Sequence, residues 1–359
     1  MIRVEEHLSP EAWQQALLRL PLSCRDSYFT AGYVEAHAAN GDGRPFCVEV
    51  SENENTLMVT GLQVPIPFTP DADRTACRYD VQTCNGYGGP IVSANADSAF
   101  LGRAWGEWRD RCRARGVVAA FFRLHPLLEN ERWLPPDARV VSDRKTVFVD
   151  LVKGLQTAWQ DAESRHRNMV NKGHRVGVSV VWDDPSGWDD FETLYRKAMM
   201  RLDAPGHLRY GHDSFARLSL LSGVELACVR RNGILDAAAV FMFGPCWCHY
   251  HLSARREGAG NHLTSCLLQS ALERAAGRGL QGFHLGGGKT ISGSDALLKF
   301  KLSLGGRLLD YKVALVVTDL PAYNGLCARW SNETGEAPQW LLGYRQPKPV
   351  GRRQGEQCV

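Results

Sequence analysis

The sequence lacks the marks of several protein classes. It contains no Cys-x-x-Cys pair, and its eleven cysteines are odd in number and scattered along 359 residues. A disulfide framework and a zinc ribbon are therefore disfavoured, and most cysteines should be small core residues. The first residues, MIRVEEHLSPEAWQQALL, carry acids and no apolar run. We expect neither a signal peptide nor a membrane span there, and we expect a cytoplasmic protein.

A large excess of one charge is also missing. Lys and Arg number 42 and Asp and Glu 39, which gives a formal net charge of +3 at pH 7. This charge is too small to indicate nucleic-acid binding by itself. The length, in contrast, exceeds the roughly 250 to 300 residues that one hydrophobic core fills. We therefore expect two domains of similar size.

The segment GFHLGGGKTISGSDALLKFKLSLGG, residues 282–306, superficially resembles a phosphate-binding loop. A Walker loop places four residues between its first glycine and Gly-Lys-Thr. Here five residues separate Gly282 from Gly288, so Phe283 stands where the first glycine should be. The pattern argues against nucleotide binding, and the glycine triplet requires another explanation.

The two halves of the chain repeat one order of elements. Residues 78–92 are typical of a strand and a glycine turn, 97–116 of an amphipathic helix and 117–124 of a buried strand. In the second half the same order recurs as a strand at 246–254, a helix at 261–279 and a strand at 280–285. Both helices end in Arg-Gly, and the two glycines, Gly116 and Gly279, are separated by close to half the chain. This repeat predicts a duplicated α/β domain.

Six motifs then follow in a recognisable order. They are YDVQTCNGYGGP (79–90), RHRNMVNKGHRVGV (165–178), YRKAMMRLDAPGHLRYGHDSF (195–215), YHLSA (250–254), FHLGGG (283–288) and LLKFKLSLGG (297–306). Together they resemble the Fem-type transferases, which are tandem GNAT-fold proteins that move an amino acid from aminoacyl-tRNA onto an amine. The resemblance covers about 79–310, and each motif alone is weak.

The resemblance implies an α/β (α+β) protein with two GNAT-like domains. Residues 1–150 would form the first domain, on the acceptor side. Residues 320–345 would fold back to complete it. Residues 151–319 would form the second domain, on the donor and catalytic side, and 346–359 a flexible tail.

The implied reaction needs no cofactor beyond the aminoacyl-tRNA co-substrate, because its ester is already activated. The enzyme must bring a deprotonated amine to the ester carbonyl and stabilise the oxyanion. By the resemblance, Lys301 is the catalytic cation near the tRNA terminus, and Phe300 stacks on the terminal adenosine. Pattern alone equally allows an exposed alternating strand, in which Lys301 points into solvent.

The acceptor side is also assigned by the resemblance. We predict Tyr79, Asp80, Tyr87, Gly88, Gly89, Arg201, Tyr210 and Tyr250 as its lining. Asp80 could take the amine proton, although a loop-capping role is the commoner one for such a residue. Cell-wall members carry a lysine that meets diphosphate where this chain has His37, four residues after Tyr33. Neutral imidazole is a poorer partner for diphosphate, so a small amine or a peptide is the expected acceptor.

The donor side admits two alternatives. The loop RREGAG (255–260), before a helix, fits the pyrophosphate loop of CoA-dependent GNAT enzymes, so an acyl-CoA N-acyltransferase is the rival function. The predicted donor-binding residues are Arg255, Gly258, Gly260, Asn261, Gly286, Gly287 and Gly288. The basic helix offers Arg165, Arg167, Lys172 and Arg175 for RNA or another anion, although a solvated helix explains them equally well.

A metal site and a non-catalytic protein are two further hypotheses. In CWCHYH (246–251), a strand would place His249 and His251 on the face opposite Cys246 and Cys248. The histidine pair then lacks a third ligand, and we expect no metal. A non-catalytic binding protein of the same fold remains a second alternative, which the intact Phe300-Lys301 pair disfavours.

Overall fold

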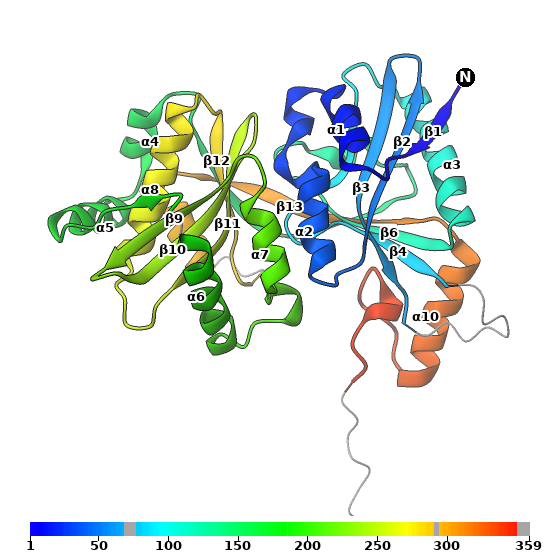
Figure 1. The fold of residues 1–359 in the computed structure, drawn as a ribbon. Coiled ribbons are helices and arrows are strands. Elements are labelled where there is room, and N and C mark those ends of the chain that lie inside the picture. Colours follow the sequence, from blue (N-terminus) through cyan, green and yellow to red (C-terminus); the bar gives the residue numbers. More distant parts are fainter. Residues whose placement is uncertain (68–76, 185, 291–293, 350–359) are drawn as a thin grey trace, which may run out of the picture.

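The computed structural model describes residues 1–67, 77–184, 186–290 and 294–349, which form two lobes (Figure 1). The strands are β1 (Arg3–Glu6), β2 (Arg44–Glu52), β3 (Asn55–Pro65), β4 (Tyr79–Gln82), β5 (Gly89–Val92), β6 (Val117–Arg123), β7 (Arg139–Asp150), β8 (Val181–Trp182), β9 (Val224–Arg231), β10 (Ile234–Phe243), β11 (Trp247–Arg255), β12 (Gly282–Gly287) and β13 (Arg307–Val317). The helices are α1 (Pro10–Leu18), α2 (Ala31–Ala39), α3 (Ser98–Ala114), α4 (Leu155–Asp161), α5 (Ser164–Arg175), α6 (Gly187–Arg201), α7 (His212–Ser219), α8 (His262–Gly277), α9 (Ala296–Leu302) and α10 (Leu320–Thr334).

One mixed sheet runs through both lobes in the order β1-β2-β3-β4-β6-β13-β7-β12-β11-β10-β9-β8, with β5 on β3. In the first half β4 pairs parallel with β6, and in the second β11 pairs parallel with β12. Helix α3 precedes β6 and helix α8 precedes β12, so the predicted repeat of strand, helix and strand is present. Gly116 and Gly279 follow these helices with φ values of 71° and 70°. This left-handed conformation favours glycine, which explains the repeated Arg-Gly.

Strands β7 and β13 join the halves at the centre of the sheet. β13 pairs with β6 through residues 313–317 and with β7 through residues 307–315, while β7 also pairs with β12. The sequence boundaries assigned 139–150 to the first domain and 307–319 to the second, and the sheet places them the other way round. The cause is packing: Ala314 and Val316 belong to the core of the first half, and Val147 and Val149 to that of the second.

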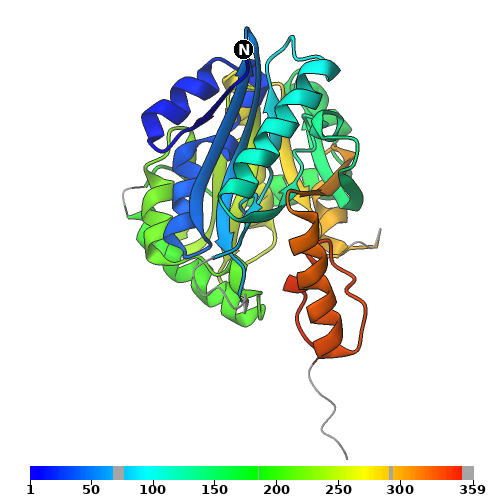
Figure 2. The same cartoon turned by 90° about the vertical axis from the view of Figure 1, so that its right-hand side faces the viewer.

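Residues 320–345 lie against the first half. Tyr323 of α10 and Leu342 pack with Val118 of β6 and Leu315 of β13. Figure 2 shows α10 lying beside and below the first-half strands. The Tyr323 hydroxyl donates to the carbonyl oxygen of Leu341 at 2.7 Å, which holds the segment after α10 against the helix.

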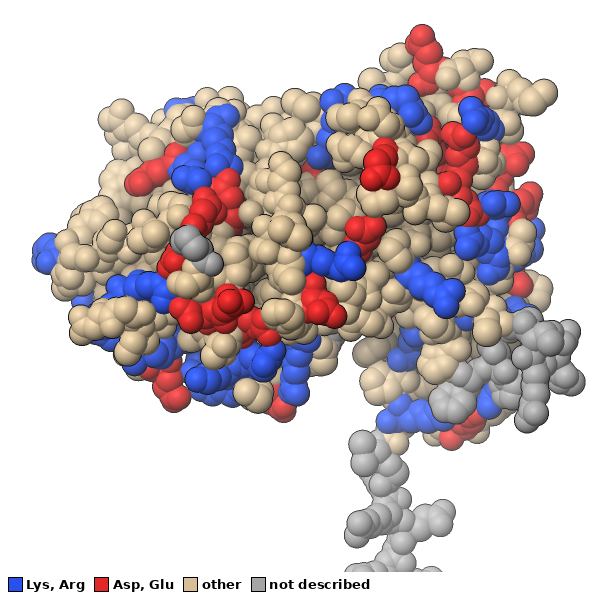
Figure 3. Space-filling model, in the orientation of Figure 1, with Lys and Arg blue, Asp and Glu red and all other residues tan. Residues whose placement is uncertain are grey.

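Charge is distributed over both lobes. On the face drawn in Figure 3, Lys and Arg lie interspersed with Asp and Glu, in keeping with the small net charge. Among the described residues, no helix combines the length and the apolar character required to cross a bilayer.

Candidate active site

A groove with a volume of about 550 Å³ lies in the second half, bounded by α5, α6, β11, α8 and α9. It brings together residues that the sequence assigned to different roles, the donor, the acceptor, the RNA contact and catalysis. Six of the predicted site residues line it: Arg165, Arg201, Tyr250, Arg255, Asn261 and Phe300. The groove is therefore the candidate active site.

Lys301 lies on helix α9 and not on a strand. The Asp295 carboxylate caps this helix, since its Oδ1 accepts the backbone N–H of Leu298 at 2.9 Å. Leu298 and Lys301, three residues apart on the helix, share one side and are both only 7% exposed. The alternating-strand interpretation, with Lys301 in solvent, is wrong.

The Lys301 ammonium is held beside the groove. Its Nζ donates to the carbonyl oxygen of Gly287 at 2.7 Å and lies 5.5 Å from the centroid of the Tyr250 ring. Burial lowers the pKa of Lys301 to about 8, although the Asp295 charge opposes the shift. Near neutral pH such a lysine is mainly cationic with an appreciable neutral fraction, so it can donate or accept a proton.

The glycine triplet builds the turn that brings these groups together. Gly286 has a φ of 71°, and a Cβ there would lie 3.5 Å from Lys301 Nζ. A Cβ on Gly288 would lie 2.6 Å from the Asp295 carboxyl carbon, which leaves no room for a side chain. Asp295 Oδ2 in turn accepts the backbone N–H of Lys289 at 2.9 Å. The close approach of Gly286 to Lys301 and of Gly288 to Asp295 is thus a physical reason for glycine at these two positions.

Tyr87 is the first-half residue that reaches this region. A Cβ on Gly286 would lie 3.6 Å from the Tyr87 hydroxyl and 3.5 Å from Lys301 Nζ, so both groups lie close to this glycine. The Tyr87 ring packs edge-on against His284, with 4.9 Å between the ring centroids, and against Tyr311 at 5.5 Å. Tyr87 therefore stands at the boundary between the first half and the Lys301 site.

The loop before α8 was predicted to bind the donor, and its geometry is compatible with anion binding. Arg255 Nη1 donates to the carbonyl oxygen of Ala259 at 2.8 Å, so the guanidinium braces the loop that contains Gly258 and Gly260. Asn261 stands at the start of α8 but makes no side-chain capping bond. The first N–H groups of α8 are thus without a side-chain cap, and an anion could bind them.

The four basic residues of α5 do not form one surface. Arg165 lines the groove. Arg167 Nη1 donates to the carbonyl oxygens of Gln160 and Ala162 and so closes the end of α4. Lys172 and Arg175 are exposed near the other end of the helix. A structural role thus explains Arg167, and Arg165 alone among the four contacts the groove.

No protein-family model and no curated protein sequence matches the chain. Solved structures do. FemX superposes with a TM-score of 0.68 at 13% identity, over 90% of this chain and 99% of FemX. L-PGS from Bacillus licheniformis gives 0.57 at 13% identity, over 88% and 95% of the two chains. A conserved protein of unknown function from Bacteroides thetaiotaomicron gives 0.58 at 11% identity, over 88% and 100%.

The chain has a Fem-like tandem GNAT fold. Together with the repeated halves of the sheet, these neighbours establish the predicted α/β architecture of two GNAT-like domains. At identities this low, the likeness concerns the Fem-like fold and not the reaction.

Several predicted acceptor residues lie away from the groove of this Fem-like fold. Gly88 and Gly89 lie in the first-half core, where Asn130 Nδ2 donates to the Gly88 carbonyl oxygen at 2.8 Å. Tyr79 pairs with Pro65 in the sheet. Tyr210 is 4% exposed, and its hydroxyl accepts a hydrogen bond from Asn85 at 2.8 Å. These positions are explained by packing.

Asp80 is an anchor for the C-terminal segment. It is fully buried, and its two carboxylate oxygens accept hydrogen bonds from the Tyr344 hydroxyl and from Arg345 Nε. Arg345 also donates to the carbonyl oxygen of Pro65 at 2.8 Å. The prediction that Asp80 takes the amine proton is therefore corrected, because its oxygens are occupied away from the groove.

We expect Arg345→Ala to lower the free energy of unfolding by about 3 kcal/mol, because it leaves the buried Asp80 carboxyl without its cationic partner and with the Tyr344 hydroxyl alone. Turnover of the folded variant should stay within about twofold of wild type. Urea unfolding and activity assays measure the two effects, with Arg329→Ala, which breaks an exposed pair with Glu333, as the control. Lost turnover at unchanged stability would contradict the anchor.

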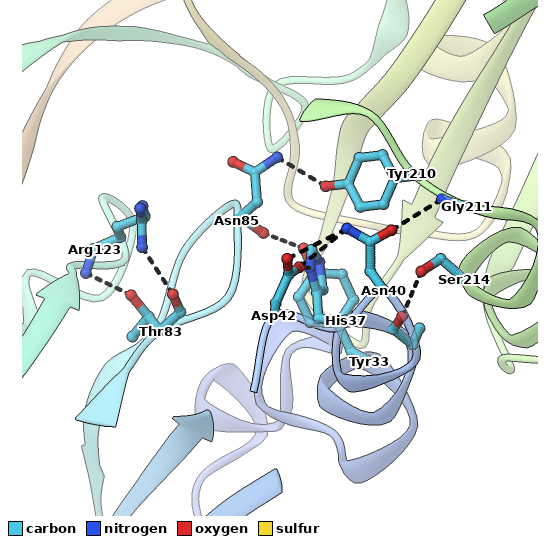
Figure 4. Close-up of polar contacts among 11 residues, drawn as sticks. Tyr33, His37, Asn40, Asp42, Thr83, Asn85, Arg123, Tyr210, Gly211 and Ser214 are labelled. Carbon is cyan, nitrogen blue, oxygen red and sulfur yellow. Dashed lines mark hydrogen bonds and ion pairs between the residues drawn. The ribbon is translucent and has the colours of Figure 1, made fainter. Parts of the chain in front are cut away.

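His37, where the resemblance predicted the loss of a phosphate-binding lysine, lies near Tyr33 and Tyr210 (Figure 4). His37 is 1% exposed, and its ring lies 4.9 Å from that of Tyr33 and 5.4 Å from that of Tyr210, measured between centroids. Around it α2 is tied to the second half, since Ser214 Oγ donates to the Ala36 carbonyl oxygen at 2.7 Å. His37 thus belongs to the interface between the halves.

A buried cluster that the sequence did not predict joins the halves nearby. His249 Nε2 of β11 lies 2.8 Å from Asp26 Oδ2, and His125 Nε2 lies 3.9 Å from Asp26 Oδ1. Asp26 and His125, and not the His251 of the His-x-His hypothesis, are the neighbours of His249 here, and the three ligand atoms lie within 4.8 Å of one another. However, His125 Nδ1 accepts the Leu127 N–H at 3.3 Å, so the ring proton is on Nε2, facing Asp26. His249 Nε2 is hydrogen-bonded to the Asp26 carboxylate at 2.8 Å, whereas His125 Nε2 makes no hydrogen bond to it. A protonated Nε2 on His125 cannot coordinate a metal ion, so this arrangement disfavours a metal site.

Sequence reasoning also missed two residues inside the groove, His166 and Ser265. In α5, His166, Val170 and Gly173 are buried and lie on one side of the helix at helical spacing. The basic residues between them suggested an exposed helix instead. That spacing is the signal that could have identified His166.

Proposed function

We propose that the protein is an aminoacyltransferase that moves an amino acid from aminoacyl-tRNA to the amine of a small molecule or peptide. The observation that carries the proposal is Lys301, buried against the Tyr250 ring and the Gly287 carbonyl beside the groove. It occupies the Phe-Lys pair of the Fem-type pattern, within a Fem-like tandem GNAT fold. Fem-type transferases, which the motifs resemble, use this donor.

The proposed reaction replaces an ester bond by an amide bond. The amine nitrogen attacks the ester carbonyl, the bond from carbon to the ribose oxygen breaks, and the amine loses a proton while the ribose oxygen gains one. Lys301 is suited to stabilise the oxyanion and to protonate the departing oxygen, because burial strengthens its electrostatic effect and lowers its pKa to about 8. Phe300, half-buried at the groove, offers a face for the terminal base.

The acceptor is inferred from the first half. A nucleotide-linked muropeptide requires a cation at the position of His37, which is buried among Tyr33 and Tyr210. An enclosed imidazole ring gives a diphosphate no access. A smaller amine, or a peptide without a nucleotide, therefore fits this chain better.

A second candidate function is an acyl-CoA-dependent N-acyltransferase. The loop at Arg255 and the start of α8 at His262, which has no side-chain cap, support it, because pyrophosphate could bind there. Arg255 and Asn261 both line the groove.

Incubation with an amine panel and either charged total tRNA or acetyl-CoA distinguishes the two donors. We expect aminoacylated product from charged tRNA alone, and ribonuclease treatment before the incubation should abolish it. Mass spectrometry of the products is the measurement, with uncharged tRNA as the control. Product from acetyl-CoA that survives ribonuclease would replace the proposal by the second candidate.

A further inference from the structure

Two buried polar side chains in the groove have no hydrogen-bond partner. His166 is 2% exposed and Ser265 is fully buried, and both line the groove. Within the described residues, Ser265 Oγ forms no hydrogen bond, and neither ring nitrogen of His166 meets a partner at hydrogen-bond distance and angle, although the Gln269 side chain lies beside the ring. Buried polar atoms in native proteins are nearly always bonded, so unpaired ones at the wall of a cavity indicate a ligand that pairs with them.

The two side chains belong to one contact between α5 and α8. The Gln269 side chain lies close enough to His166 to raise its pKa against the larger effect of burial. Ser265 precedes Gln269 by four residues on α8, so both lie on the same side of that helix. The Gln269 amide is itself engaged, because its Nε2 donates to Glu273 Oε1 at 2.9 Å.

The first turn of α5 also abuts the end of α9. The backbone N–H of Glu163 donates to the carbonyl oxygen of Ser303 at 2.9 Å, two residues after Lys301. Phe300 and Ser303 line the same groove as His166. One groove thus connects Phe300 and Ser303, which flank Lys301 in the sequence, with His166.

The chemistry of this part of the groove selects for a neutral polar group. Burial lowers the pKa of His166, so at neutral pH its ring offers one donor and one acceptor, as does the Ser265 hydroxyl. Four cationic residues line the groove: Arg165, Arg201, Arg255 and Lys289. The one lining carboxylate, Asp295, is engaged by the backbone N–H groups of Lys289, Thr290 and Leu298. An ammonium side chain finds no free carboxylate among the described lining residues.

We propose that His166 and Ser265 form a subsite that hydrogen-bonds a hydroxyl or carboxamide on the side chain of the transferred amino acid. The inference rests on the proposed function and specifies its donor. An apolar side chain of the same shape leaves both buried groups unpaired. A site that hydrogen-bonds a polar substrate group rejects such an apolar isostere strongly for this reason. A cationic side chain adds repulsion from the four basic residues.

Threonine and valine, which have nearly the same shape, provide the test. Non-reactive 3′-aminoacylamido analogues of the tRNA terminus carrying threonine, valine or lysine are titrated by calorimetry, and transfer from the corresponding charged tRNAs is measured in competition. For the wild type we expect a preference of at least tenfold for threonine over valine in both assays, and lysine weakest. Ser265→Ala and His166→Leu, which remove the hydrogen-bonding groups, should reduce the ratio of threonine to valine severalfold.

Ser219→Ala is the matched control, because Ser219 lies outside the groove and its hydroxyl donates to the carbonyl oxygen of Ala216 at 2.8 Å. It should leave the ratio unchanged. An unchanged ratio in a folded Ser265→Ala variant, or a wild-type preference for valine or lysine, overturns the subsite while transfer itself persists. Absence of binding by every analogue and of transfer from every charged tRNA overturns the proposed function and the subsite with it.

Discussion

Replacing Lys301 by methionine should stabilise the protein and at the same time lower its turnover by on the order of a hundredfold or more. The folded-state pKa of about 8 lies below the ordinary value of 10.5. The unfolded chain therefore binds the proton more tightly, and stability attributable to this group rises with pH through the window between these values. At pH 7 the folded protein carries the full cost of the buried charge, roughly 3 kcal/mol. Loss of the hydrogen bond to the Gly287 carbonyl offsets about 1 kcal/mol of that gain.

Turnover should fall because the interaction of the ammonium strengthens only as charge develops on the reacting atoms. Single-turnover transfer from charged tRNA and a thermal melt measure the two effects on the same variant. Lys301→Arg keeps the charge but not the compact ammonium, so partial recovery would indicate a mainly electrostatic role. Lys299→Met, on the exposed side of the same helix, should change neither quantity. Wild-type turnover in a folded Lys301→Met variant would remove Lys301 from the mechanism.

Acidification from pH 7 to pH 5 should destabilise the folded protein steeply. Burial lowers the pKa of His125 to about 4, of His251 to about 3 and of His284 well below its usual value. Between these values and about 6.5 the unfolded chain binds a proton at each site and the folded chain does not, so the folded protein loses stability as the pH falls through this window. Three such groups give a slope of about 4 kcal/mol per pH unit at most. The buried Asp80, whose pKa burial raises against the pull of Arg345, opposes part of this slope at its acid end.

Urea unfolding at pH 7, 6 and 5 measures the slope. His251→Gln should lower this slope by about 1.4 kcal/mol per pH unit, the contribution of one proton, because that ring then no longer takes up a proton on unfolding. His212 is exposed, and its hydrogen bond to Glu192 raises its pKa, so His212→Gln should not lower the slope. Stability that is independent of pH over this range would contradict the neutral, buried state of these histidines.

The sequence predicted the features that depend on neighbouring residues. Apolar periodicity located α3 and α8, and the Arg-Gly pair after each helix indicated the glycine with positive φ that ends it. Helix α9 was ambiguous because its seven residues are too few to separate period 2 from period 3.6, and its start depends on the Asp295 cap. The predicted helices and strands therefore agree best with the structure where they are long.

The site was less predictable, because its contacts join distant segments. Asp80 was interpreted as a candidate base, yet its partner Arg345 lies 265 residues further along the chain. Asp26 and His249 are 223 residues apart, and nothing local to either one indicates the other. For Lys301, the residue type was informative, but its burial depends on Tyr250 of β11 and Gly287 of β12, which only the folded chain brings to α9.

The central position of β7 and β13 has a consequence for the order in which the chain can fold. The first half receives its last strand, β13, from a segment that is synthesised after every strand of the second half. Until residues 307–317 emerge from the ribosome, β6 has an open edge, and so does β7. Open edges invite pairing with other chains. A nascent chain stopped before residue 307 should therefore associate with its neighbours, and its first half should mature after the second despite having been made first.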